Sequence, residues 1–188
     1  LKQRNALLKL FNETGRPDWE ALESYNHVLA PLGNDLYATR KSFVGEFLPL
    51  FLRFYNFLVS DEETVSLQYC SGLDQQSFAE GFRQTKNKDL ALQRTSFGIH
   101  RDEFDFTINN GDLKKLGSQG QQKSFVIAMK LAQAQLIKQH KSFSPLLLLD
   151  DIFDKLDDYR ISKLLALIKE DGGQLFITDA RPERTKQL

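Results

Sequence analysis

The first sixty residues carry hydrophobic side chains at the three- and four-residue spacing of amphipathic helices. Residues 1–11 predict a first helix, and the segment Thr14-Gly15-Arg16-Pro17 ends it with two strong helix breakers. Asp18 is a suitable N-cap for a second helix that begins directly afterwards. The chain is therefore expected to open with helices packed against one another.

Pro31 and Gly33 predict an interruption of this second helix, because proline lacks an amide hydrogen and glycine is a poor helix former. A third helix is expected over residues 35–58, with a kink at Pro49. Its apolar side chains are too many for a single stripe. We therefore expect this helix to make contacts on more than one face.

The middle of the chain contains both periodicities. Residues 64–70 alternate between apolar and polar side chains and predict a strand. Two short helices are expected at residues 75–84 and 88–94. The charged residues here are scattered, as they are on solvated helix faces.

The pattern changes near residue 97. Residues 103–108 alternate strictly, and Asn109-Asn110-Gly111 follows as a turn able to adopt positive φ, so a β-hairpin is expected. Residues 123–140 place their apolar side chains on one stripe and predict a helix.

Three elements near the C-terminal end predict a parallel α/β unit. Residues 146–149 are four consecutive leucines, which is typical of a strand buried on both faces. A helix is expected over residues 158–169 and a second strand over 174–178. Strand, helix and strand in this order imply parallel strands joined by a right-handed crossover. The expected fold class is thus α/β, preceded by a mainly helical domain.

The composition excludes several classes of protein. The 188 residues include 25 basic and 25 acidic side chains and are 41% hydrophobic, which excludes disordered and fibrous chains. Because the formal net charge is zero, any polyanion must be held by local patches. Cys70 is the single cysteine, which excludes an internal disulfide and fits the reducing cytoplasm. No apolar run approaches the ~20 residues needed to span a bilayer, so no membrane partner is expected.

Two adjacent carboxylates directly follow the run of leucines. Asp150 and Asp151 would stand at the carboxyl edge of a parallel sheet, where ligands collect. One could bind a divalent cation while the other positions or deprotonates a water molecule. The structural alternative is that they cap the following turn. A calcium loop that continues to Asp154 is excluded, because Ile152 and Phe153 break the required spacing.

A loop rich in glycine and glutamine, residues 116–123, precedes the helix expected from Lys123. Its small residues would let backbone amides approach a ligand closely, and a helix N-terminus favours anions. Ser118 adds a hydroxyl and Lys123 a cation, so the loop suits a phosphate group. The alternative for an isolated loop is an ordinary serine-capped turn.

Several well-known catalytic motifs are absent from the 188 residues. The sequence has no Gly-x-x-x-x-Gly-Lys-Ser/Thr loop, so by itself the chain is not expected to hold a nucleotide tightly. It has no Gly-x-Ser-x-Gly and no His-Glu-x-x-His, and its single cysteine and three histidines lack zinc-ligand spacing.

With these motifs in place, the chain resembles the C-terminal part of the RecF family, bacterial recombination-repair ATPases related to the SMC and ABC ATPase heads. The resemblance covers most of the chain. It departs at Ile99, where the family commonly has proline. The segments that carry it are Leu1–Leu8, Gly98–Asp102, Gly117–Lys123, Leu146–Asp151 and Leu156–Arg160.

The resemblance implies a role for each candidate site residue. Ser118-Gln119-Gly120-Gln121-Gln122 looks like the ABC-type signature motif, whose serine contacts the γ-phosphate of ATP held by a partner subunit. Asp150 matches the metal-binding aspartate, and Asp151 matches the catalytic carboxylate that orients water. Asp157 falls in the loop that lies across the dimer interface. Thr178 is the candidate sensor of the γ-phosphate.

The resemblance also implies the domains, cofactors and partners. Residues 1–96 would form a helical arm domain, and residues 97–188 the C-terminal half of an ABC/SMC-type ATPase head of the P-loop NTPase fold. ATP and Mg²⁺ are the implied cofactors; the implied partners are single-strand/duplex DNA junctions, a second copy of the protein, RecO and RecR. We expect the missing phosphate-binding loop upstream of Leu1, and a slow DNA-stimulated ATPase in the full-length protein. The present chain alone is expected to be inactive.

Two other function classes remain open from the residues alone. A metal-dependent phosphodiesterase or nuclease would use Asp150, Asp151 and Asp154 to cleave DNA without a nucleotide. A pure interaction module would use its acidic residues only as caps, with Asp157 or Asp158 at the start of the helix over 158–169.

Overall fold

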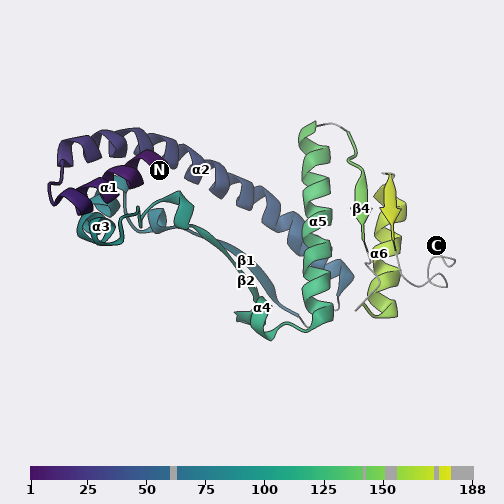
Figure 1. The fold of residues 1–188 in the computed structure, drawn as a ribbon. Helices are drawn as coiled ribbons and strands as arrows, with labels where there is room; N and C mark the ends of the chain where they lie inside the picture. The colour runs from purple at the N-terminus through teal and green to yellow at the C-terminus, as the bar shows by residue number, and fades with distance from the viewer. Residues whose placement is uncertain (60–62, 142, 151–155, 172–173, 179–188) are drawn as a thin grey trace. The chain divides into compact units, whose positions relative to one another are not determined.

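The computed structural model describes residues 1–59, 63–141, 143–150, 156–171 and 174–178. Its described part is mixed α/β and mostly helical (Figure 1). By its internal contacts the chain divides into two compact units. Unit 1 consists of Leu1–Phe43 and Gln68–Phe104, and unit 2 of Val44–Leu67 and Asp105–Leu188.

This division differs from the boundary expected between residues 96 and 97. Residues 44–67 group with the C-terminal residues because Phe51 and Tyr55 pack on Phe125, with the Phe51 and Phe125 rings 4.6 Å apart. The predicted arm and head domains, which rest on the family resemblance, stay a prediction.

Unit 1 is built from helices and short 3₁₀ turns. Gly15 ends the first helix in the left-handed conformation, with φ 65°, as the predicted break requires. Two small apolar clusters form its core, one around Leu8 and Phe11 and one around Phe78 and Phe97. The elements are α1 (Lys2–Thr14), the first part of α2 (Trp19–Leu58), η1 (Gly72–Asp74), α3 (Phe78–Leu92) and η2 (Ile99–Arg101).

The predicted interruption at Pro31 and Gly33 is wrong, because α2 is one helix of 40 residues. Gly33 is the place where the ring of Phe78 meets α2: a Cβ added to Gly33 would lie 2.2 Å from the Phe78 Cζ. The two short helices expected at residues 75–84 and 88–94 are likewise one helix, α3. In both helices, packing outweighs the local propensity that predicted a break.

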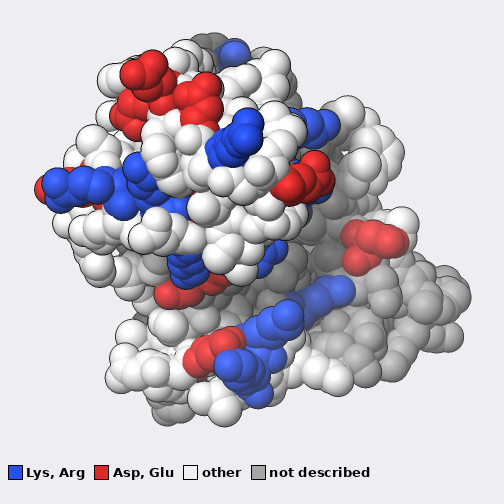
Figure 2. Space-filling model, turned by 60° about the vertical axis from the view of Figure 1, so that its left-hand side comes forward, with Lys and Arg blue, Asp and Glu red and all other residues white. Residues whose placement is uncertain are grey.

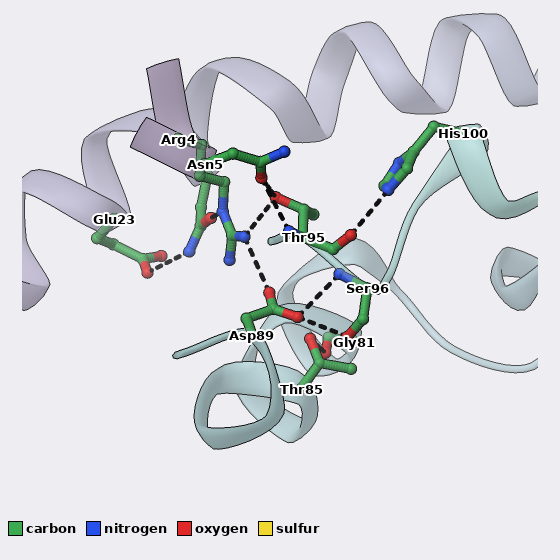
Figure 3. A network of polar contacts seen from close by, with 10 residues as sticks. Arg4, Asn5, Glu23, Gly81, Thr85, Asp89, Thr95, Ser96 and His100 are labelled. Atoms are coloured by element: carbon green, nitrogen blue, oxygen red, sulfur yellow. Dashed lines mark hydrogen bonds and ion pairs between the residues drawn. The ribbon is translucent and has the colours of Figure 1, made fainter. Parts of the chain in front are cut away.

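A buried polar network ties the elements of unit 1 together (Figure 3). The Arg4 guanidinium on α1 donates to Asn26 on α2 (2.8 Å), to Asp89 on α3 (2.9 Å) and to Thr95 (2.7 Å). The second carboxylate oxygen of Asp89 accepts from the Ser96 amide at 2.8 Å. The side chains of Arg4 and Asp89 are 1% and 0% exposed, so this ion pair is completely removed from water.

Unit 2 contains the second part of α2 and most of the β-structure. The predicted hairpin is confirmed: Asn109 and Asn110 have φ values of 48° and 64°, and Ile108 pairs with Gly111 across the turn. Strands β1, β2 and β3 form one sheet in that order. Strands β1 (Val65–Cys70) and β2 (Glu103–Ile108) belong to unit 2 only in part, because residues 68–70 and 103–104 group with unit 1. The elements that lie wholly in unit 2 are β3 (Gly111–Asp112), α4 (Leu113–Leu116), α5 (Gln119–Lys141), β4 (Leu147–Leu149), α6 (Asp158–Asp171) and β5 (Leu175–Ile177).

Strands β4 and β5 are parallel, as the order of strand, helix and strand predicts. The expectation that residues 146–149 are buried on both faces is wrong. Leu149 is 5% exposed and joins the main core cluster with Phe125, but Leu148 is 72% exposed. Its cross-strand partner Phe176 is 50% exposed on the same face. In the described part of the chain, one face of this two-stranded sheet is therefore open.

Among the described residues, no helix combines the length and apolar character needed to cross a membrane. On the face drawn in Figure 2, basic and acidic side chains stand in small neighbouring groups. A field of one sign is not formed there, in agreement with the zero formal net charge of the whole chain.

Candidate functional site

The carboxyl ends of β4 and β5 bring Asp150 and Thr178 together. Leu149 pairs with Ile177 in the last register of the sheet, and the Thr178 amide donates to the Leu149 carbonyl at 3.0 Å. The Thr178 hydroxyl then donates a hydrogen bond to the Asp150 carboxylate. Both side chains are exposed. Asp150 therefore stands at the ligand-binding edge of a parallel sheet, with its carboxylate oriented by a neighbouring strand.

The candidate signature segment forms the first turn of α5. The helix begins at Gln119, four residues before the predicted start, so the expected loop is confined to Gly117 and Ser118. The Ser118 hydroxyl accepts from the Gln121 amide at 3.2 Å, and the Gln121 side chain accepts from the Ser118 amide at 2.8 Å. This reciprocal pair is a capping box, and it explains the earlier helix start.

Capping leaves the Ser118 hydroxyl available for a further contact. A hydroxyl that accepts one hydrogen bond still carries its own proton and can donate it. Ser118 and Gln119 are both exposed. Below them, the Gln122 side chain donates to the Gly117 carbonyl at 2.9 Å. A Cβ at Gly117 would lie 2.6 Å from the Leu113 carbonyl oxygen, so this close turn requires glycine.

One pocket joins the start of α5 to the end of β4. It has a volume of about 470 Å³, and its wall includes Gln119 and Gln122 from the capped turn and Asp150 from the strand edge. Lys123 and Lys130, one heptad apart on α5, add positive charge. The structure thus places the two motifs predicted from separate parts of the sequence around one space.

The residues present fit only part of a magnesium site. Asp151 and Asp154 lie outside the described residues, so the nuclease alternative cannot be built on them. Within the described part of the chain, no three His, Cys, Asp or Glu side chains converge as metal ligands would. Mg²⁺ in phosphate-handling sites uses one or two carboxylates together with phosphate oxygens, and Asp150 fits that smaller ligand set.

Asp157 caps the N-terminus of α6. One of its carboxylate oxygens accepts from the Arg160 amide at 2.8 Å, and the other lies 3.6 Å from the Arg160 Nε. Asp157 itself is exposed, while Leu156 directly before it is buried in the main core cluster. The residue expected at a dimer interface therefore lies on a firmly anchored turn.

Sequence reasoning missed the residues that hold Arg160. Its guanidinium donates to Glu63 at 2.9 Å, and the second oxygen of Glu63 accepts from the Tyr55 hydroxyl at 2.6 Å. Burial raises the pKa of Tyr55 well above its usual range, and the Glu63 carboxylate adds to this shift. Tyr55 is thus a permanent donor near neutral pH. Because Glu63 and Arg160 are 97 positions apart, no local pattern could have joined them.

Comparison with known proteins places these features in a family. No family model matches the chain. The chain is 46% identical over 186 residues to the DNA replication and repair protein RecF of Cytophaga hutchinsonii, covering 98% of the chain and 49% of that relative. It is 44% identical over 187 residues to the RecF of Flavobacterium johnsoniae, covering 99% of the chain and 52% of that protein.

A solved structure gives the same result. The recombination mediator protein RecF of the RecFOR pathway, solved with ATP, matches with a TM-score of 0.79 at 25% identity. The match covers 97% of the present chain and 51% of that one. The chain therefore belongs to the RecF family, and it spans about half the length of the curated relatives that it matches.

Proposed function

We propose that the full-length protein containing this chain is an ATP-dependent DNA clamp of recombinational gap repair and replication restart. ATP would be bound between two heads of a dimer that closes on single-strand/duplex DNA junctions. One pair of observations supports the proposal. In a RecF homologue, Asp150 stands at the carboxyl edge of a parallel sheet, and Ser118 caps the start of α5 with its side chain exposed.

The signature segment supplies the contact between subunits. Ser118 would donate its hydroxyl proton to the γ-phosphate of ATP held by the partner. Gln119, Gly120, Gln121 and Gln122 shape the turn that presents it, because Gln121 closes the capping box and Gln122 fixes the Gly117 carbonyl. The start of α5 adds the positive end of a helix dipole.

The strand edge supplies the hydrolytic side of the site. Asp150 would hold Mg²⁺, which, when bound, neutralises charge on the phosphates. Asp151 would orient the attacking water. Thr178 donates to Asp150 and so orients this carboxylate. It would also act as the sensor of the γ-phosphate. Asp157 would meet the partner subunit from the start of α6.

A site shared in this way couples nucleotide binding to dimerisation. Each contact across the interface exists only in the closed dimer, so ATP stabilises that state by mass action. Hydrolysis removes the γ-phosphate and with it these contacts, which releases the DNA. Because small groups of both signs lie side by side on the face in Figure 2, DNA contacts would be local. RecO and RecR are the proposed protein partners.

The proposal is tested with the full-length protein, ATP and a fluorescent junction DNA. We expect ATP to produce a dimer in analytical ultracentrifugation and to increase junction binding in fluorescence anisotropy. Ser118→Arg should abolish both effects while monomeric ATP binding persists. Asp151→Asn should hold the protein in the dimer by slowing hydrolysis. Ser24→Arg, the same change at an exposed serine of unit 1, is the matched control.

Two results would contradict the clamp. In the first, dimerisation and junction binding are the same with and without ATP. In the second, Mg²⁺ alone supports DNA cleavage that Asp150→Asn removes, which is the behaviour of a nuclease.

A further inference from the structure

A polar chain links the C-terminal part of α2 to the turn that begins α6. It runs from the Tyr55 hydroxyl to Glu63, from Glu63 to Arg160, and from Arg160 to Asp157. The side chains of Arg160 and Glu63 are only 15% and 16% exposed. All four residues belong to unit 2. An ion pair that is largely shielded from water is screened little by salt, so the pair between Arg160 and Glu63 depends less on ionic strength than a surface pair does.

The Arg160 guanidinium is shared between two carboxylates. Its NH2 group donates to Glu63 at 2.9 Å, whereas its Nε lies 3.6 Å from Asp157, outside ordinary hydrogen-bond distance. The contact of Arg160 with Glu63 is therefore stronger than its side-chain contact with Asp157. The Asp157 carboxylate keeps its main hydrogen bond to the Arg160 amide and remains exposed.

Loss of the Glu63 charge would change this balance. Arg160 would then be free to close on Asp157, since an arginine fork pairs strongly with a single carboxylate. A carboxylate engaged in that way turns toward its own helix and is less available to a second subunit. Tyr55 acts one step earlier, because its hydroxyl fixes the second oxygen of Glu63 at 2.6 Å.

We propose that Arg160 is a positioning residue for Asp157, and that Glu63 and Tyr55 hold Arg160 in the orientation that leaves Asp157 free for the partner subunit. The part of the proposal that concerns the partner rests on the proposed function. The part that concerns the orientation of the α6 turn does not. The buried Leu156 anchors one side of this turn and Arg160 anchors the other.

The test uses the full-length protein with Glu63→Gln, which keeps the shape of the side chain and removes its charge. We expect ATP-driven dimerisation to weaken roughly tenfold, the factor typical of losing a charge-assisted hydrogen bond. ATP binding by the monomer should not change. Tyr55→Phe should act in the same direction with a smaller effect.

Two comparisons separate positioning from a loss of stability. Glu46→Gln removes the charge from an exposed 2.9 Å contact between α2 and His140, near the C-terminal end of α5. It should leave dimerisation unchanged. In an Arg160→Gln background, Glu63→Gln should add nothing further, because its effect passes through Arg160. An equal additional loss in that background would assign Glu63 a separate role and overturn the proposal.

Hydrogen exchange tests the orientation without nucleotide. The Arg160 amide, which donates to Asp157, should exchange faster in Glu63→Gln, because the Asp157 carboxylate moves from this amide toward the guanidinium. The exchange rate of this amide should not change in Glu46→Gln. Unchanged exchange in Glu63→Gln would overturn the proposal, whatever ATP does. If the wild-type protein fails to dimerise with ATP, the proposed function fails, and faster exchange would still support the positioning of Asp157 by Arg160.

Discussion

The buried ion pair between Arg4 and Asp89 makes a quantitative prediction about unit 1. Asp89→Ala removes one partner and leaves the Arg4 guanidinium, 1% exposed, without its counter-charge. It also removes the acceptor of the Ser96 amide. Breaking a buried pair in this way typically costs about 3–5 kcal/mol. Because a domain has only about 5–15 kcal/mol of stability, the variant should lose a large share of the stability of unit 1.

Urea unfolding of the chain measures this loss directly. Trp19 is the single tryptophan and packs edge-on against Phe11, with ring centroids 6.0 Å apart, so its fluorescence reports on unit 1. With a slope of about 1–3 kcal/mol per molar urea, a loss of ~4 kcal/mol lowers the midpoint by more than about 1 M. Far-ultraviolet circular dichroism would follow both units and show whether unit 2 stays folded.

The control is the exposed pair between Lys41 and Asp74, which is equally short at 2.8 Å. Lys41→Met should move the midpoint far less, because water screens that pair. Replacing both buried charges, Arg4→Met with Asp89→Leu, should recover only part of the loss, since Asn26 and Ser96 still lose their partners. If Asp89→Ala unfolds at the wild-type urea concentration, burial of this pair has no energetic consequence and the reasoning is refuted.

Three further predictions use the same chain. Gly81→Ala places a Cβ 2.2 Å from a ring carbon of Phe97, so urea unfolding should show a loss of about 1–3 kcal/mol; an unchanged midpoint would mean that the ring moves freely. The hydrogen bond from Lys41, together with that from Tyr37, lowers the pKa of Asp74. The ionised Asp74 carboxylate therefore stabilises the folded state above about pH 4, and this contribution is lost as the pH falls below that value. Thermal melts between pH 2.5 and pH 6 should therefore show a weaker acid dependence for Asp74→Asn, and parallel curves would contradict this. Ser118→Ala removes the acceptor of the Gln121 amide and should destabilise the first turn of α5 by ~1 kcal/mol, seen as faster exchange of that amide; equal exchange rates would show that the capping box is not formed in solution.

The sequence pattern predicted correctly those features that depend on interactions between neighbouring residues. The hairpin at residues 109–111 follows from two asparagines that tolerate positive φ. The parallel pairing of β4 and β5 follows from the order of strand, helix and strand, which has one favoured handedness. The position of Asp150 at the strand edge is a direct consequence of that pairing, because it is the next residue in the chain.

The errors of sequence-based prediction lie where distant side chains decide. Pro31 does not end α2, and the charged network around Arg4 joins residues separated by up to 91 positions. The sequence predicts that α5 begins at Lys123, but the helix begins at Gln119, because Ser118 and Gln121 form a capping box. Both residues can be seen in the sequence, whereas the hydrogen bonds between them are seen only in the structure.

By itself, then, the sequence determined the secondary-structure type of most segments, the parallel α/β unit and the family, because periodicity, turn residues and motif order are properties of neighbouring positions. Tertiary structure alone decided that α2 is continuous and that Glu63 holds Arg160 beside Asp157. It also decided that, among the residues that the structure describes, nothing covers Leu148 and Phe176 on one face of β4 and β5. Each of these depends on burial and on contacts between remote residues, and their free energies are absent from any local stretch of chain.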